Sequence, residues 1–131
     1  MKPKHYFFLG IGGIGNSALA QYFLQQGSQV AGYDRVQSLV TKKLEAQDID
    51  VVYEFDPKAL PDFVDRQTTT IVCTAAIKKD QPWYRYFIEQ GFTIEKRAKV
   101  LAQIANAQIC VAVAGTHGKT TTLALLTHIF K

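Results

Sequence analysis

Two glycine-rich loops in this chain have the residue types and spacing of phosphate-binding sites. The first spans residues 10–15, has the sequence Gly-Ile-Gly-Gly-Ile-Gly, and satisfies the pattern G-x-G-x-x-G. Such glycines let the backbone turn tightly and approach phosphates, which rest on free N–H groups at the start of a helix. Asp34 follows Gly15 by nineteen residues, where a carboxylate would meet a ribose hydroxyl. Alone, this loop predicts a nicotinamide or flavin dinucleotide, or a tight turn that binds nothing.

The second loop spans residues 115–120 and has the sequence Gly-Thr-His-Gly-Lys-Thr, which ends like a P-loop. In a P-loop, backbone N–H groups cradle phosphates, the lysine reaches the β- and γ-phosphates, and the next hydroxyl binds Mg²⁺. Lys119 is therefore the predicted catalytic residue and Thr120 the predicted Mg²⁺ ligand. Val113 stands where the general pattern has its first glycine. The predicted ATP-binding residues are Gly115, Thr116, His117, Gly118, Lys119, Thr120 and Thr121.

Alternating strands and helices are expected to position both loops. Short apolar runs predict strands over residues 6–9, 29–33, 50–53, 69–74, 92–95 and 109–114. Helical spacing predicts helices over residues 16–26, 38–47, 81–90, 98–105 and 120–130, and a weaker pattern predicts a short helix within 57–66. We expect Ser38 and Asp80 to cap the helices that follow them. The alternation predicts an α/β fold with a doubly wound, Rossmann-like parallel sheet.

The two loops fall into two predicted domains. Residues 1–107 would form the Rossmann-like domain, and residues 108–131 would form the first strand, P-loop and helix of an incomplete ATPase domain. Two phosphate loops about a hundred residues apart imply two anionic ligands. The sequence therefore predicts a transfer or ligation between those ligands.

Composition excludes several other classes of protein. The net charge is +4 and the basic residues are scattered, whereas nucleic-acid binding needs a concentrated basic face. No stretch is long enough to span a membrane, and no signal peptide is evident. Cys73 and Cys110 lie in apolar runs, as buried free thiols of a reducing compartment do. We therefore expect a cytoplasmic protein that binds neither nucleic acid nor membranes.

Taken together, the loops resemble those of the Mur ligases, the ATP-dependent amide-forming enzymes of peptidoglycan synthesis. The ATP loop of that family has the form G-T-[HN]-G-K-T, which residues 114–122 fit with the histidine variant. The match is colinear and runs nearly the whole length. Segments that look like the N-terminal signature of the L-alanine-adding branch are residues 8–15, 32–34, 74–80 and 96–101. Asn16 departs from the usual methionine of the family, and Ala75 departs from a common serine.

This resemblance implies that the first domain binds the UDP part of UDP-N-acetylmuramate. Residues 12–16 would hold the diphosphate, and Asp34 and the turn over 74–77 would lie near the uridine. Arg97 would either offer its charge to the ligand or lie solvated at the surface. His117 would either orient a phosphate or the sugar carboxylate, or face solvent. The implied substrate-binding residues are Gly12, Gly13, Ile14, Gly15, Asn16, Asp34, Thr74, Ala75, Ala76, Arg97 and His117.

The resemblance also implies a reaction. ATP, with Mg²⁺, would phosphorylate the sugar carboxylate, and the amino group of L-alanine would attack the acyl phosphate. The remaining metal ligands and the amino-acid site would lie beyond Lys131, so we expect no ligase activity from these residues alone. Apolar residues of the tail need cover, and we expect them to pack on the first domain or on a second copy. They are Leu123, Leu125, Leu126, Ile129 and Phe130.

Three alternatives remain open on the sequence. A related ligase attaches recycled tripeptide to the same UDP-sugar, and its ATP loop is similar. A nicotinamide-binding domain would use residues 10–15 and Asp34 but would leave the second loop unexplained. A non-catalytic module that senses a UDP-sugar is the third.

Overall fold

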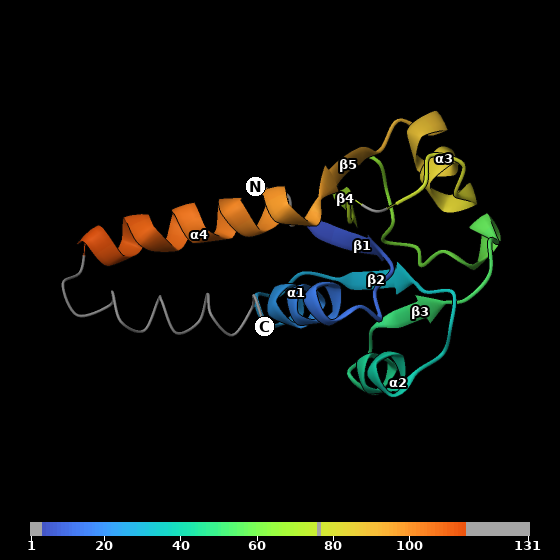
Figure 1. The fold of residues 1–131 in the computed structure, drawn as a ribbon, viewed down its shortest axis with the longest axis horizontal. Helices are drawn as coiled ribbons and strands as arrows, with labels where there is room; N and C mark the ends of the chain where they lie inside the picture. Colours follow the sequence, from blue (N-terminus) through green and yellow to red (C-terminus); the bar gives the residue numbers. More distant parts are fainter. Residues whose placement is uncertain (1–3, 76, 115–131) are drawn as a thin grey trace.

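The structure is a computed structural model that describes residues 4–75 and 77–114. A five-stranded parallel sheet forms the centre of this part of the chain, with strand order β3-β2-β1-β4-β5 (Figure 1). The strands are β1 (His5–Leu9), β2 (Val30–Tyr33), β3 (Asp50–Val52), β4 (Thr69–Cys73) and β5 (Thr93–Lys96). Each lies within one or two residues of a strand predicted from an apolar run.

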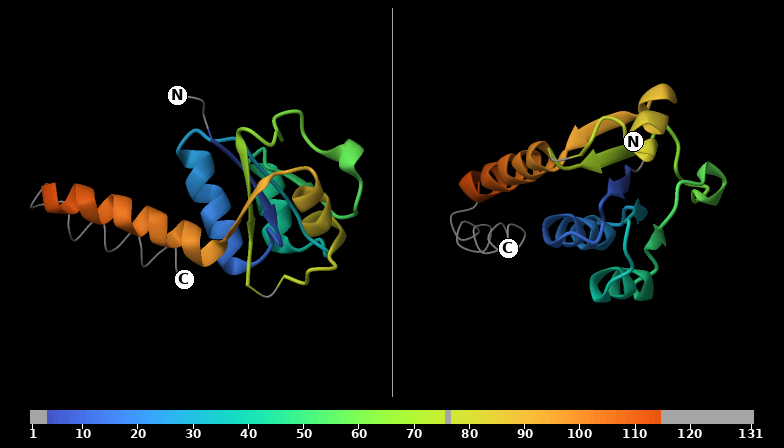
Figure 2. Two further views of the ribbon diagram at one scale, coloured as in Figure 1. Left: turned by 90° about the horizontal axis from the view of Figure 1, so that it is seen from above. Right: turned by 45° about the vertical axis from the view of Figure 1, so that its right-hand side comes forward.

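Helices cover both faces of the sheet, which confirms the predicted doubly wound α/β fold. The helices are α1 (Ile14–Gln25), α2 (Leu39–Ala46), α3 (Pro82–Glu89) and α4 (Arg97–Ala114), with a short 3₁₀ turn η1 (Pro57–Ala59). Figure 2 shows α1 and α4 on one side of the strands and α3 and η1 on the other. Leu44 places α2 in the same apolar core as α1 and α4.

Alternation along the strands builds two separate cores. On β1, Phe8 packs with α1, α2 and α4, whereas Phe7 points to the opposite face and packs with α3. Phe7 lies 5.7 Å from Trp83 and 5.2 Å from Phe87, measured between ring centroids, and all three are fully buried. Because burial of each such ring contributes about 2–3 kcal/mol, β1 is fixed firmly between the two layers.

The strand order places a topological switch point at the carboxyl end of β1. The chain leaves β1 toward β2 and β3, and then crosses back to β4 on the other side of β1. In open parallel sheets, ligands bind in the crevice outside the strands at such a point. The first glycine loop follows β1 directly, so the fold presents that loop at this crevice.

Two local predictions are wrong. Residues 109–114 do not form a strand but continue α4, which extends beyond the sheet in Figure 1. Within the described residues no neighbouring strand pairs with that segment, so continuation of α4 is what satisfies its backbone hydrogen bonds, despite its β-branched residues. The short helix predicted within residues 57–66 is present as the 3₁₀ turn η1. Gln81, rather than Asp80, caps α3 by accepting from the N–H of Tyr84 at 3.0 Å.

Candidate functional site

The first glycine loop is tied to the end of β2. Gly10 adopts a positive φ of 84°, and the N–H groups of Gly10 and Ile11 donate to the carbonyl of Tyr33 at 2.7 and 3.0 Å. Ile11 is fully buried against β2 at Gly32, where an added Cβ would lie 2.6 Å from Ile11 Cδ1. The loop therefore has a fixed starting position, and Gly32 makes its close approach possible.

The loop leaves the first turn of α1 without an internal cap. Gly13 is the N-cap residue and supplies no side chain, and the first N–H with a helical acceptor is that of Ser17, at 2.8 Å from the Gly13 carbonyl. Among the described residues, nothing accepts from the N–H groups of Ile14, Gly15 and Asn16. Three free N–H groups and the positive end of the helix dipole make this turn suited to an anion.

Arg97 brings a positive charge to the same turn. It is the first residue of α4 and follows β5 without a loop. A Cβ added at Gly15 would lie 2.5 Å from Arg97 Nη1 and 2.9 Å from its Cζ. The guanidinium therefore lies directly against Gly15, and the arginine is partly buried rather than freely solvated. Arg97 and the start of α1 are brought together from opposite ends of the domain.

Asn16 supports the loop from inside the protein. Its side chain is 1% exposed, and its Nδ2 donates to the carbonyls of Leu9 and Gly10 at 3.2 and 3.1 Å. Its Oδ1 has no partner within the described part of the chain. These bonds hold the end of β1 against α1, so only the backbone N–H of Asn16 faces the first turn as a free donor.

The carboxylate of Asp34 accepts hydrogen bonds from the backbone of two loops. Its Oδ2 accepts from the N–H of Gly12 at 2.8 Å, and its Oδ1 accepts from the N–H of Val36 at 3.1 Å. The carboxylate thus joins the glycine loop to the segment that follows β2. Sequence reasoning placed Asp34 at the ligand, but it did not foresee the bond to Gly12.

A cavity of about 490 Å³ opens beside these residues at the carboxyl ends of β1, β2 and β4. Of the predicted site residues, Asp34 and Thr74 line it, Ala75 is exposed nearby in sequence, and Ala76 lies outside the described residues. Neighbouring wall residues that the sequence analysis did not select are Tyr33, Arg35, Lys78, Asp80 and Gln81. Their positions at or after the ends of β2 and β4 are the signal that would have found them, because the carboxyl ends of parallel strands meet at one edge of the sheet.

Cys73 lies at the end of β4, immediately before this cavity. The thiol is buried, and burial raises its pKa above the usual range. A protonated, buried thiol is a poor nucleophile, so Cys73 acts here as a small apolar residue.

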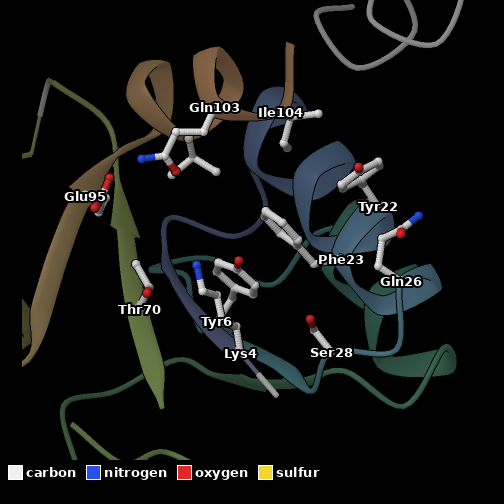
Figure 3. A pocket seen from close by; sticks show the side chains of 11 residues that line it. Lys4, Tyr6, Tyr22, Phe23, Gln26, Ser28, Thr70, Glu95, Gln103 and Ile104 are labelled. Carbon is white, nitrogen blue, oxygen red and sulfur yellow. The ribbon is translucent and has the colours of Figure 1, made fainter. Parts of the chain in front are cut away.

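A second cavity, of about 430 Å³, lies between α1 and α4 over the sheet (Figure 3). Its walls come from β1, α1, β5 and α4, and include Tyr6, Phe23, Glu95 and Gln103. Burial, with the nearby Tyr22 and Glu95, raises the pKa of Tyr6, so its phenol stays neutral. None of the predicted site residues lines this cavity, and Glu95 already pairs with Lys99 at 3.7 Å.

The second glycine loop, with all the predicted ATP and Mg²⁺ residues and His117, lies outside the described residues. Within residues 4–75 and 77–114, no group of three or more His, Cys, Asp and Glu side chains gathers as a metal site. No helix in that part of the chain is long and apolar enough to cross a membrane.

Comparison with known proteins gives a consistent family. Residues 5–109 match the model of the Mur ligase family, catalytic domain. The chain is 45% identical over 130 residues to a UDP-N-acetylmuramate–L-alanine ligase of Christiangramia forsetii, covering 98% of this chain and 29% of that protein. It is 42% identical over 126 residues to the enzyme of the same name from Flavobacterium johnsoniae, covering 96% of this chain and 28% of the relative. The chain thus spans less than a third of these relatives.

Solved structures share the fold. The UDP-N-acetylmuramate–alanine ligase of Thermotoga maritima superposes with a TM-score of 0.70 at 23% identity, over 79% of this chain and 23% of that one. The UDP-N-acetylmuramate:L-alanyl-γ-D-glutamyl-meso-diaminopimelate ligase of Neisseria meningitides gives 0.66 at 25% identity, over 78% and 31%. With the family model matching most of its length, the chain belongs to the Mur ligase family.

Proposed function

We propose that this chain is the UDP-sugar-binding part of an ATP-dependent ligase that joins L-alanine to UDP-N-acetylmuramate. One observation carries the proposal: the uncapped first turn of α1, with Arg97 against Gly15, lies at the switch point of the sheet. The relatives named above act as further support, because several of them carry the name of that ligase.

The diphosphate would lie on the first turn of α1. The N–H groups of Ile14, Gly15 and Asn16 would donate to its oxygens, and Arg97 would neutralise part of its charge. Gly13 would let the ligand approach the backbone, because it carries no side chain there. The uridine would then extend into the neighbouring cavity of about 490 Å³, beside Asp34 and Thr74, with Ala75 and Ala76 at its edge.

The ligase step would use residues of the second loop. Bound ATP and Mg²⁺ would supply the phosphoryl group and the charge that activate the sugar carboxylate toward L-alanine. Lys119 would hold the transferred phosphoryl group, Thr120 would bind the metal, and His117 would orient a phosphate or the carboxylate. These assignments rest on the sequence pattern. We expect no turnover by this chain alone, in a protein of the cytoplasm, and we expect its apolar tail to promote self-association.

Calorimetric titration of the purified chain with UDP-N-acetylmuramate tests the proposal, with NAD and ATP as parallel ligands. We expect the UDP-sugar to bind and Arg97→Ala to weaken it by about tenfold or more, because a charge-assisted contact is lost. Arg85→Ala, an exposed arginine on α3, is the matched control and should bind like the unaltered chain. Binding of NAD in place of the UDP-sugar would favour a dinucleotide domain instead.

The tripeptide-recycling ligase remains a second candidate, because the Neisseria enzyme that takes a tripeptide shares this fold. Both candidates use the same UDP-sugar, so the titration above does not separate them. The higher identity to L-alanine ligases favours the first.

A further inference from the structure

The carboxylate of Asp34 lies where the proposed nucleotide would meet the protein, yet both of its oxygens are already bonded to backbone N–H groups. Oδ2 accepts from Gly12 at 2.8 Å and Oδ1 accepts from Val36 at 3.1 Å. Gly12 and Asp34 are separated by 22 residues, so this bond adds a side-chain link to the backbone bonds by which Gly10 and Ile11 already join the glycine loop to the end of β2.

We propose that Asp34 is a positioning residue, which fixes the glycine loop through Gly12 so that the free N–H groups of Ile14, Gly15 and Asn16 are ready for a diphosphate. This inference rests on the proposed function, and it assigns Asp34 to the diphosphate half of the ligand rather than to the nucleoside half.

The space around Gly12 is just large enough for its contact with Asp34. An added Cβ at Gly12 would lie 2.6 Å from Asp34 Oδ2 and 3.0 Å from Thr41 Cγ2. A side chain at this position would therefore push the carboxylate away. The φ of Gly12 is not in the left-handed region, so the need for glycine here comes from space rather than from backbone conformation.

The bond between Gly12 and Asp34 reduces the conformational entropy that the loop would lose on binding a ligand. Gly12 and Gly13 are adjacent glycines, which lose more conformational freedom on ordering than other residues do. If the ligand had to order them, its affinity would fall accordingly. The bond from Gly12 to Asp34 orders the loop before the ligand arrives. It also occupies the N–H of Gly12, so that an anion meets Ile14, Gly15 and Asn16 instead.

The charge of Asp34 would otherwise oppose this role. A free carboxylate beside a diphosphate repels it, but two N–H groups that donate to the carboxylate disperse its charge. The effect of removing Asp34 therefore distinguishes the two possibilities. A positioning residue weakens diphosphate binding when it is lost, whereas a merely repelling carboxylate strengthens it.

The experiment compares uridine with UDP, using chemical-shift titration for the weaker ligand and calorimetry for the stronger. For Asp34→Ala we expect UDP affinity to fall by about tenfold and uridine affinity to stay within about twofold. Asp34→Asn should lie between, since one amide oxygen replaces two acceptors. Asp62→Asn removes the charge of an exposed carboxylate that touches neither the glycine loop nor this cavity, and it is the matched control. An equal loss for uridine and UDP, an unchanged UDP affinity or a gain would each overturn the proposal.

A failure of UDP to bind would contradict the proposed function but would not test the contact between Gly12 and Asp34. A double-mutant cycle tests that contact independently of any ligand. Unfolding is measured for Gly12→Ala, Asp34→Ala and the double variant. We expect Gly12→Ala to be less harmful in the Asp34→Ala background, because the carboxylate that its Cβ meets is gone. Additive effects, with unchanged hydrogen exchange of the Gly12 amide in Asp34→Ala, would show that Asp34 does not fix the loop.

Discussion

The first turns of α1 and α2 differ in how their backbone N–H groups, which have no acceptor within the helix, are satisfied. At α2, Ser38 Oγ accepts from the N–H of Thr41 at 3.2 Å, and Thr41 Oγ1 accepts from the N–H of Ser38 at 2.8 Å. At α1, the N-cap is Gly13, no side chain caps the turn, and three N–H groups stay free. Both helices follow neighbouring strands of one sheet, so the difference is local.

That difference is also one of local stability. A capping side chain contributes about 1 kcal/mol to a helix, and α1 does without it. The same turn has glycines at Gly12, Gly13 and Gly15 and a guanidinium at its edge. The α2 turn is completed by its own side chains, whereas under the proposed function an anion would complete the α1 turn.

Substitution at Gly32 should have the largest effect, because the position holds the glycine loop against β2. A Cβ there would lie 2.6 Å from Ile11 Cδ1 and 2.8 Å from the carbonyl oxygen of Phe8. Gly32→Ala should lower the free energy of unfolding by about 3 kcal/mol, since backbone and a buried side chain would both have to shift. Urea denaturation followed by circular dichroism measures this. A loss below about 0.5 kcal/mol would contradict the close packing.

Substitution at Gly15 should separate binding from stability. Gly15→Ala places a Cβ 2.5 Å from Arg97 Nη1, so the guanidinium must move away from the turn. We expect UDP affinity to fall about tenfold. The free energy of unfolding should stay level or rise by about 0.5–1 kcal/mol, because alanine favours the helix. Parallel calorimetry and denaturation test both halves, and unchanged affinity would argue against a role for Arg97.

Removal of the α2 cap should have the smallest effect. In contrast to Gly15→Ala, it should lower stability and leave UDP affinity unchanged. Ser38→Ala should cost about 1 kcal/mol of stability, because the N–H of Thr41 loses its acceptor. UDP affinity should be unaffected, since α2 contributes no free N–H at the site. If Ser38→Ala weakened UDP binding as much as Gly15→Ala, the contrast between the two helices would not hold.

Local sequence signals predicted the parts of the fold that depend on local physics. Apolar runs located the five strands, and Ser38 was correctly predicted to cap α2. The strand expected over residues 109–114 failed because a strand depends on neighbours, which periodicity does not reveal. Asp80 was chosen as a cap by residue type alone, whereas Gln81 has the right place in the turn.

The place of the candidate site in the fold was predictable from the sequence, whereas the contacts within it were not. The glycine pattern located the uncapped turn that opens α1, and Asp34 lies beside it at the carboxyl edge of the sheet. The position of Arg97 against Gly15 was left open, because it depends on how α4 packs beside α1. The bonds from Asn16 to Leu9 and Gly10 and from Gly12 to Asp34 depend likewise on tertiary geometry.

The most direct test of the central claim is a ¹⁵N chemical-shift titration of this chain with UDP-N-acetylmuramate. The account predicts that the largest shifts fall on the amides of Ile14, Gly15 and Asn16, with little change at Leu39 and Val40 in the first turn of α2. Shifts centred on the cavity beside Tyr6 and Glu95, or equal shifts at both helix starts, would contradict it.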